Sequence, residues 1–207
     1  MGKVVALASL LQDRQVWRGR AAPTPGNGQT TGWPALDAVL PGGGWPEAAL
    51  TEILLPADGV GELQLLMPTL ARCTRAGRTV VVVAPPYAPY VPGWEAHGVR
   101  MAQLEIVLAE PRDALWATEQ CLRSGSCAAV LAWPAQADDR ALRRLQVAAD
   151  TGKALAFVFR DRRHAAQASP AALRLELETQ PSWQLRVRKC RGGHPPSHPL
   201  PLPAGWS

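Results

Sequence analysis

From residue 50 onward, short apolar runs alternate with amphipathic stretches. Strands are predicted over residues 50 to 55, 79 to 84, 104 to 108, 128 to 133 and 154 to 159. The run at 79 to 84 (TVVVVA) is continuously apolar, as in strands buried on both faces of a parallel sheet. Apolar positions at helical spacing predict three long helices between these runs, over residues 63 to 76, 113 to 124 and 138 to 151. Repeated βα units of this kind predict an open, mostly parallel sheet with helices on both faces.

The C-terminal part changes period. Residues 173 to 178 and 183 to 188 carry an apolar side chain at every second position and are separated by the turn-like sequence TQPS. This alternation predicts an antiparallel addition at one edge of the sheet. The fold class is therefore α/β, a mostly parallel sheet flanked by helices with an antiparallel edge at its C-terminal side.

The two ends of the chain differ from this middle part. Residues 3 to 17 are predicted to form a helix, and residues 18 to 32 (RGRAAPTPGNGQTTG) a linker. We divide the chain into an N-terminal arm with the start of its linker (1 to 22), an α/β domain (23 to 190) and a proline-rich tail (191 to 207) that is either extended over the surface or disordered.

The N-terminal arm has the shape of a docking element, although it can equally pack on its own core. Its candidate contacts with a partner are Leu7, Leu10, Leu11 and Trp17. Trp17 and Trp206 lie on the terminal segments, where exposed aromatic side chains make strong interface contacts, so we expect both to anchor a partner.

Composition narrows the class of protein. The chain has 207 residues, of which 47% are hydrophobic and 19% charged, as expected for one globular domain. No apolar stretch is long enough to span a membrane and residues 1 to 10 lack a secretory signal, so we expect a cytoplasmic protein without a membrane partner. The four cysteines include no CxxC pair, and they are expected to be reduced and mostly buried. No metal-ligand spacing or nucleophile motif is present, so we expect no metal site, catalytic residue or cofactor.

The segment after the first apolar run has the context of a phosphate-binding loop. Such loops lie between a strand and a helix and follow the pattern GxxxxGK[ST]. Here Gly59 and Gly61 are present, but Glu62 stands at the lysine position and Leu63 at the hydroxyl position. A carboxylate would repel phosphate, and Leu63 cannot bind magnesium, so ATP binding in the ordinary pose is disfavoured. A plain βα turn with two glycines is the alternative.

Two basic clusters are candidate contacts for DNA or for an acidic partner surface, consistent with a net charge of +5. The first cluster, Arg160, Arg162 and Arg163, follows the strand expected at residues 154 to 159. A solvated loop with an internal ion pair through Asp161 is its alternative. The second cluster is Arg186, Arg188, Lys189 and Arg191. Its alternative is the ordinary charge that protects an edge strand from aggregation.

Nearly the whole chain resembles the RecA recombinase superfamily. The resemblance lies in the N-terminal helix, in TGWPALDAVLPGGGWPEAALTEILLP, in the degraded loop, and in the strands TVVVVAPPYAP and ALAFVFRDRR. Within the superfamily the chain is most similar to the ImuA family, RecA-like accessory proteins of a bacterial mutagenesis cassette. The pattern departs from a recombinase at Glu62, at Ala84, where a catalytic glutamate would follow, and at Trp133, where an aspartate would hold the metal.

The resemblance implies a non-catalytic accessory protein in SOS-induced translesion DNA synthesis. It would bind a polymerase-like partner of the ImuB type, with RecA and DNA as further candidates. The cell-division inhibitor SulA is a related RecA-like protein, and a SulA-like inhibitor that binds the tubulin-like division protein is the alternative. A divergent NTPase is a third reading, which tight magnesium-dependent ATP binding would support.

Overall fold

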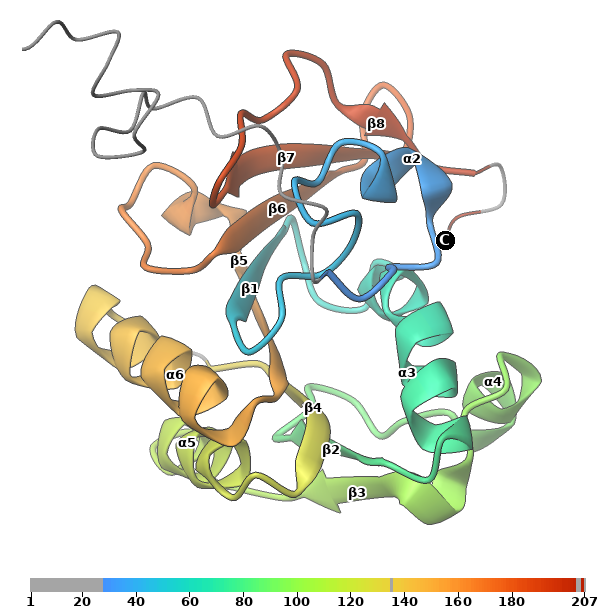
Figure 1. The fold of residues 1–207 in the computed structure, drawn as a ribbon, viewed down its shortest axis with the longest axis vertical. Helices are drawn as coiled ribbons and strands as arrows, with labels where there is room; N and C mark the ends of the chain where they lie inside the picture. The colour runs from blue at the N-terminus through green and yellow to red at the C-terminus, as the bar shows by residue number, and fades with distance from the viewer. Residues whose placement is uncertain (1–27, 135, 204–205, 207) are drawn as a thin grey trace, which may run out of the picture.

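A single eight-stranded sheet forms the centre of the computed structural model, which describes residues 28 to 134, 136 to 203 and 206. The strand order is β3-β2-β4-β5-β1-β6-β7-β8 (Figure 1). The strands are β1 (Leu50–Leu55), β2 (Thr79–Val83), β3 (Leu104–Val107), β4 (Cys127–Ala132), β5 (Leu155–Asp161), β6 (Leu173–Glu178), β7 (Gln184–Cys190) and β8 (Leu200–Pro201).

Strand direction divides the sheet into two parts. The six strands from β3 to β6 are parallel, whereas β7 runs antiparallel to β6 and β8 runs antiparallel to β7. Every residue of β1 and β4 is buried, as expected for strands that are covered on both faces. The mostly parallel α/β sheet with an antiparallel C-terminal edge is therefore confirmed.

Helices cover the two faces of the sheet separately (Figure 1). The α-helices are α2 (Pro34–Asp37), α3 (Met67–Arg75), α4 (Val91–Ala96), α5 (Ala114–Arg123) and α6 (Asp139–Gly152). One core layer includes Leu70 of α3 and Trp94 of α4, and the other includes Leu122 of α5 and Leu145 of α6. Three 3₁₀ helices complete the described elements, η1 (Glu62–Leu65), η2 (Met101–Gln103) and η3 (Arg162–His164).

The helix expected over residues 63 to 76 is interrupted near its start. The chain first forms η1, and α3 begins only at Met67 with Pro68 in its first turn. Proline is tolerated there because the first N–H groups of a helix have no intrahelical partner. The chain between β1 and α3 therefore forms a loop and then the 3₁₀ helix η1, of which Glu62 is the first residue.

The proline-rich tail contributes to the core, contrary to the expectation of a purely superficial or disordered segment. Leu200 and Pro201 pair with β7, and Trp206 is buried. The indole rings of Trp33 and Trp206 lie 5.2 Å apart, centroid to centroid. The prediction that Trp206 is an exposed partner anchor is wrong, because the ring finds an aromatic partner within its own chain. Leu7, Leu10, Leu11 and Trp17 lie outside the described residues.

Candidate functional site

The loop after β1 has the backbone of a tight βα turn. Gly59 and Gly61 adopt positive φ angles of 77° and 82°, and Gly61 caps the start of η1. A side chain at Gly59 would also be crowded, because an added Cβ would lie 3.1 Å from the ring of Tyr87. Both glycines are therefore needed by the turn itself, as in the alternative that the sequence left open.

Glu62 points back into this loop. Glu62 is only 4% exposed, and its Oε1 accepts a hydrogen bond of 3.2 Å from the Gly59 N–H. The Gly59 N–H, a backbone donor that could bind an anion, therefore already donates to a carboxylate of the same chain. The second oxygen, Oε2, is buried and has no hydrogen-bond partner among the described residues.

A pocket of about 300 Å³ lies beside the loop. Its lining combines Glu62 and its neighbours with the segment after β2, helix α4 and Trp133. Ala84 directly follows β2 and has a φ of 45°, a strained angle for alanine. Pro85 and Pro86, which come next, line the pocket. Tyr87 and Tyr90, which also line the pocket, are 65% and 71% exposed.

Trp133 directly follows β4, at the same end of the parallel strands as the loop after β1. Its ring stacks on Phe159 of β5 with the centroids 4.4 Å apart and an angle of 17° between the planes. Its indole N–H has no hydrogen-bond partner among the described residues. Trp133 therefore stands where the resemblance predicts a metal-binding aspartate. It provides an aromatic ring and an indole N–H without a partner among the described residues.

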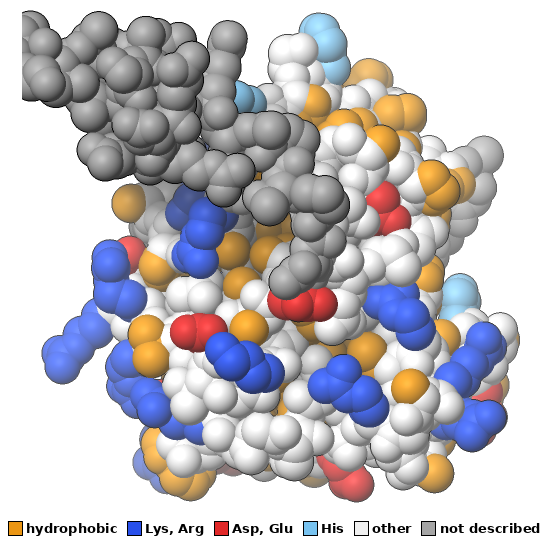
Figure 2. Space-filling view, in the orientation of Figure 1, with side chains coloured by type: hydrophobic (Ala, Val, Ile, Leu, Met, Phe, Trp, Pro, Cys, Tyr) orange, Lys and Arg blue, Asp and Glu red, His pale blue; other side chains and the backbone are white. Residues whose placement is uncertain are grey.

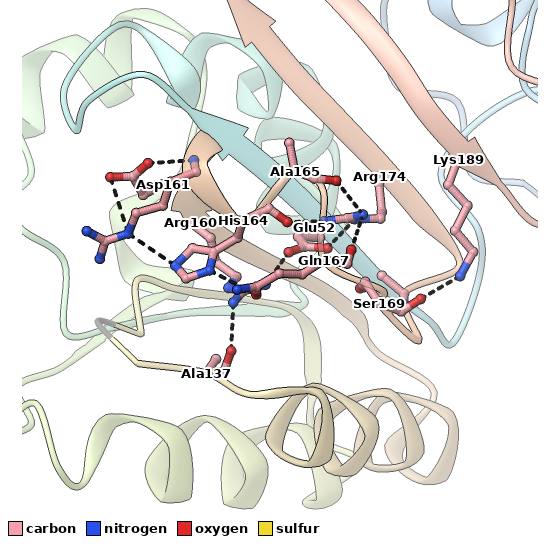
Figure 3. Close-up of polar contacts among 12 residues, drawn as sticks. Glu52, Ala137, Arg160, Asp161, His164, Ala165, Gln167, Ser169, Arg174 and Lys189 are labelled. Carbon is pink, nitrogen blue, oxygen red and sulfur yellow. Dashed lines mark hydrogen bonds and ion pairs between the residues drawn. The ribbon is translucent and has the colours of Figure 1, made fainter.

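Arg160 does not face solvent, so its prediction as a contact for nucleic acid or a partner is wrong for this structure. Its guanidinium lies 2.5 Å from Oε1 of Glu52 in β1, and it also donates to the carbonyl oxygen of Ala137 at 2.7 Å (Figure 3). Arg174 of β6 reaches the other oxygen of Glu52, also at 2.5 Å. The three side chains form a buried ion triad across β5, β1 and β6, and Glu52 is fully buried within it.

Arg174 was not among the predicted site residues, although one feature of the sequence pointed to such a partner. A glutamate in the middle of the apolar run LTEILL must be paired if the strand is buried on both faces. Arg174 meets that need and also donates to the carbonyl oxygens of His164, Ala165 and Gln167 (Figure 3). It therefore fixes the segment after β5, in which two predicted basic residues lie.

The remaining predicted cations fall into two groups. Arg162 and Arg163 are exposed at η3, where Arg163 lies 3.8 Å from Asp161. Arg186 and Arg188 of β7 instead pair with carboxylates of β6, Glu178 at 2.5 Å and Glu176 at 2.6 Å. The hydrogen bond to Glu178 raises the pKa of Arg186.

Lys189 and Arg191, at the end of β7 and just after it, contact the segment between β5 and β6. Lys189 donates to the carbonyl oxygen of Ser169 at 2.7 Å and Arg191 to that of Pro170 at 3.3 Å, so the end of β7 lies against the segment after β5. Burial lowers the pKa of the Lys189 ammonium, and the positive charges of Arg191 and Arg174 lower it further. Figure 2 shows the Lys and Arg side chains of one face scattered, with Asp and Glu among them. On that face they do not form a continuous basic stripe.

Two further properties concern only the described part of the chain. Three or more His, Cys, Asp or Glu side chains do not come together there in a group that could hold a metal ion. Its helices are also too short or too polar to cross a membrane. Of the four cysteines, Cys73, Cys127 and Cys190 are buried and Cys121 is partly exposed, so the expectation that they are mostly buried is confirmed.

Comparison with known proteins adds little to this description. No protein-family model matches the chain, and no curated protein matches it. Among solved structures, the chain is similar to the crystal structure of SulA from Pseudomonas aeruginosa, with 24% sequence identity and a TM-score of 0.46. The match covers 53% of this chain and 96% of the SulA chain.

Proposed function

We propose that this chain is a non-catalytic RecA-like accessory protein of the ImuA type that acts in SOS-induced translesion DNA synthesis. In this role it binds a polymerase-like protein of the ImuB type, and it contacts RecA or DNA in the same assembly. The proposal combines the sequence resemblance with the geometry of the loop after β1. It assigns the protein to binding rather than to catalysis.

The position of the Glu62 carboxylate carries the non-catalytic part of the proposal. The carboxylate accepts the Gly59 N–H that a phosphate oxygen would need, and it lies where a phosphate-binding lysine is required. An ATP phosphate in this loop would have to displace it or lie beside it with the same charge. We expect no saturable binding of ATP with magnesium by calorimetry, whereas micromolar binding would favour the divergent NTPase.

Exposed apolar side chains at the same end of the sheet support a protein partner. Tyr87 and Tyr90 follow β2, and Leu108 and Trp116 follow β3, with exposed fractions between 62% and 86%. All four lie beyond the carboxyl ends of parallel strands, the end at which the loop after β1 also lies. Large exposed apolar side chains that gather at one end of a domain are typical of an interaction surface.

The partner is tested by a pull-down from DNA-damaged cells of the source organism, read by mass spectrometry. The baits are the full chain, a version without residues 1 to 22, and a full chain with Tyr87 and Tyr90 changed to serine. Recovery of an ImuB-type protein or RecA by the full chain supports the proposal, and loss with either variant locates the contact. Recovery of the tubulin-like division protein instead would favour the SulA-like inhibitor.

Direct DNA contact is tested separately by a gel shift with single-stranded DNA at low salt. Arg162 and Arg163 are the exposed cations of the first cluster, so the double change to glutamate should abolish a shift that these residues carry. Arg140 is an exposed arginine on α6, and Arg140→Glu is the control for the single changes Arg162→Glu and Arg163→Glu, because each of the three alters the net charge by two units. An equal loss in all three single variants would mean only general electrostatic attraction.

A further inference from the structure

The pocket beside the loop contains a carboxylate whose hydrogen bonding is incomplete. Among the described residues that line it, Glu62 is the only Asp, Glu, Lys or Arg, and most of the others are apolar or aromatic. One oxygen of Glu62 accepts the Gly59 N–H, whereas Oε2 is buried without a donor. Leaving a buried charged oxygen unpaired is strongly unfavourable, so a native protein retains it only where something compensates.

The lining favours an organic cation as the missing donor. A metal ion needs several oxygen, nitrogen or sulfur ligands, and the described residues bring no such group together. A phosphate or another anion would be repelled by the carboxylate. Tyr87, Tyr90, Trp94 and Trp133 supply aromatic surface instead, which attracts a cation through the negative face of each ring.

A second polar group of the lining is also without a partner. The indole N–H of Trp133, which lines the same pocket, has no partner among the described residues. A ligand that supplies both a cationic donor and a neutral acceptor meets both needs, and a peptide segment with a basic residue has these two groups. Arginine fits the aromatic and proline walls better than lysine, because its guanidinium is planar, less strongly hydrated and able to stack.

We propose that this pocket receives an arginine side chain of a partner protein. Oε2 of Glu62 and the indole nitrogen of Trp133 are both buried in the free protein, so binding requires the two side chains to shift toward the pocket. The guanidinium then donates to Oε2 of Glu62 and stacks on the aromatic wall, while the Trp133 N–H donates to a backbone carbonyl of the same segment. The inference rests on the proposed partner-binding function and gives that function a chemical specificity. The degraded phosphate loop thereby becomes a site for a cation in place of an anion.

The test uses three blocked tripeptides as probes, acetyl-Gly-X-Gly-amide with arginine, citrulline or lysine at X. Citrulline has nearly the shape of arginine but no charge. Binding is followed by NMR through the indole N–H signals of Trp94 and Trp133. We expect saturable shifts with the arginine peptide at a dissociation constant on the order of 1 mM, as for a very small contact. The citrulline peptide should bind about tenfold more weakly. No binding of the arginine peptide, equal binding of citrulline, or tighter binding of lysine would overturn the proposal.

Two variants locate the interaction. Glu62→Gln keeps the size of the side chain and an acceptor for the Gly59 N–H, but removes the charge. This variant should bind the arginine peptide about tenfold more weakly, with the same affinity as the citrulline peptide. The control is Glu47→Gln, the same change at an exposed glutamate outside the pocket, which should alter neither peptide. If Glu62→Gln leaves the preference for arginine intact, the pocket is not the site.

The peptide titration and the pull-down fail independently. The titration needs only the purified full chain, so it can succeed even if the partner is not a polymerase-like protein. Conversely, a polymerase-like partner recovered by the full chain, together with an inert pocket in the titration, would keep the proposed function and remove the arginine specificity.

Discussion

Two buried glutamates, ten positions apart in the chain, have opposite environments. Glu52 in β1 is enclosed by Arg160 and Arg174, and both of its oxygens are paired. Glu62, at the start of η1, has one oxygen on a backbone N–H and the other without a partner among the described residues. The same residue type is thus part of the structural framework at one position and an incomplete site at the other. What separates the two roles is the completeness of the hydrogen bonding and not the burial.

The largest expected effect is at Glu52. Glu52→Gln leaves two buried guanidinium groups without a negative partner, and breaking a buried ion pair in this way costs about 3–5 kcal/mol. We expect urea unfolding to show a loss of this size. The control is Glu176→Gln, which removes a pair with the exposed Arg188 and should cost less than about 1 kcal/mol. Similar losses in both variants would contradict a framework role for Glu52.

At Glu62 the expected change has the opposite sign. Glu62→Gln replaces an unpaired buried charge by a neutral amide that still accepts the Gly59 N–H. Because the unpaired buried group is destabilising, the variant should gain about 1–3 kcal/mol in the free energy of unfolding. Urea unfolding of the two glutamine variants side by side is the direct comparison. A loss of stability at Glu62 would mean that the carboxylate is already paired, and would weaken the case for a cation site.

Backbone strain beside the pocket gives a smaller effect. Ala84 holds a φ of 45°, which glycine adopts without the steric penalty. Ala84→Gly should therefore raise the free energy of unfolding by about 0.5–1 kcal/mol, after the larger entropy loss of glycine is included. Thermal unfolding measures the gain. Ala88→Gly, in the same segment but without a positive φ, is the control and should not stabilise.

The smallest expected effect is a change in the pH dependence of stability, and it depends on Lys189. The pKa of Lys189 is lowered by burial first, and then by Arg191 and Arg174. A base with a lower pKa in the folded state binds fewer protons than the unfolded chain, so this lysine makes stability rise as pH increases through its folded pKa toward 10.5. Lys189→Gln should remove that rise, as measured by urea unfolding at several pH values between about 8 and 10.5. Parallel curves for the two proteins would contradict the shift.

Much of the fold follows from local patterns. The expected strands 50 to 55 and 173 to 178 agree with β1 and β6, and the other main strands agree to within about two residues at each end. These elements have apolar runs or alternation that can be read within a few residues. Helix α4 was missed because its sequence, VPGWEA, contains proline and glycine in one short turn.

The site was less predictable because it depends on contacts distant in sequence. Arg160 looked like a free cation beside Arg162 and Arg163, yet its partner Glu52 is 108 positions away, and Arg174 is 122 positions from the same carboxylate. The replacement of the phosphate-binding lysine by Glu62 was evident from the sequence. That the carboxylate turns onto Gly59 and leaves one oxygen unpaired follows only from the path of the folded loop.

Trp33 connects the C-terminal tail to the pocket beside the loop. Its ring packs against Trp206, and its indole N–H donates a hydrogen bond of 3.0 Å to the carbonyl oxygen of Leu65 in η1, the element that begins with Glu62. The packing of Trp206 in the tail and the position of η1, which contains Glu62, are thus linked through the side chain of Trp33. By thermodynamic reciprocity, a ligand that favours the pocket conformation supported by Trp33 also favours the docked tail, to the same extent. Protease resistance of the C-terminal segment would then report on what the pocket holds.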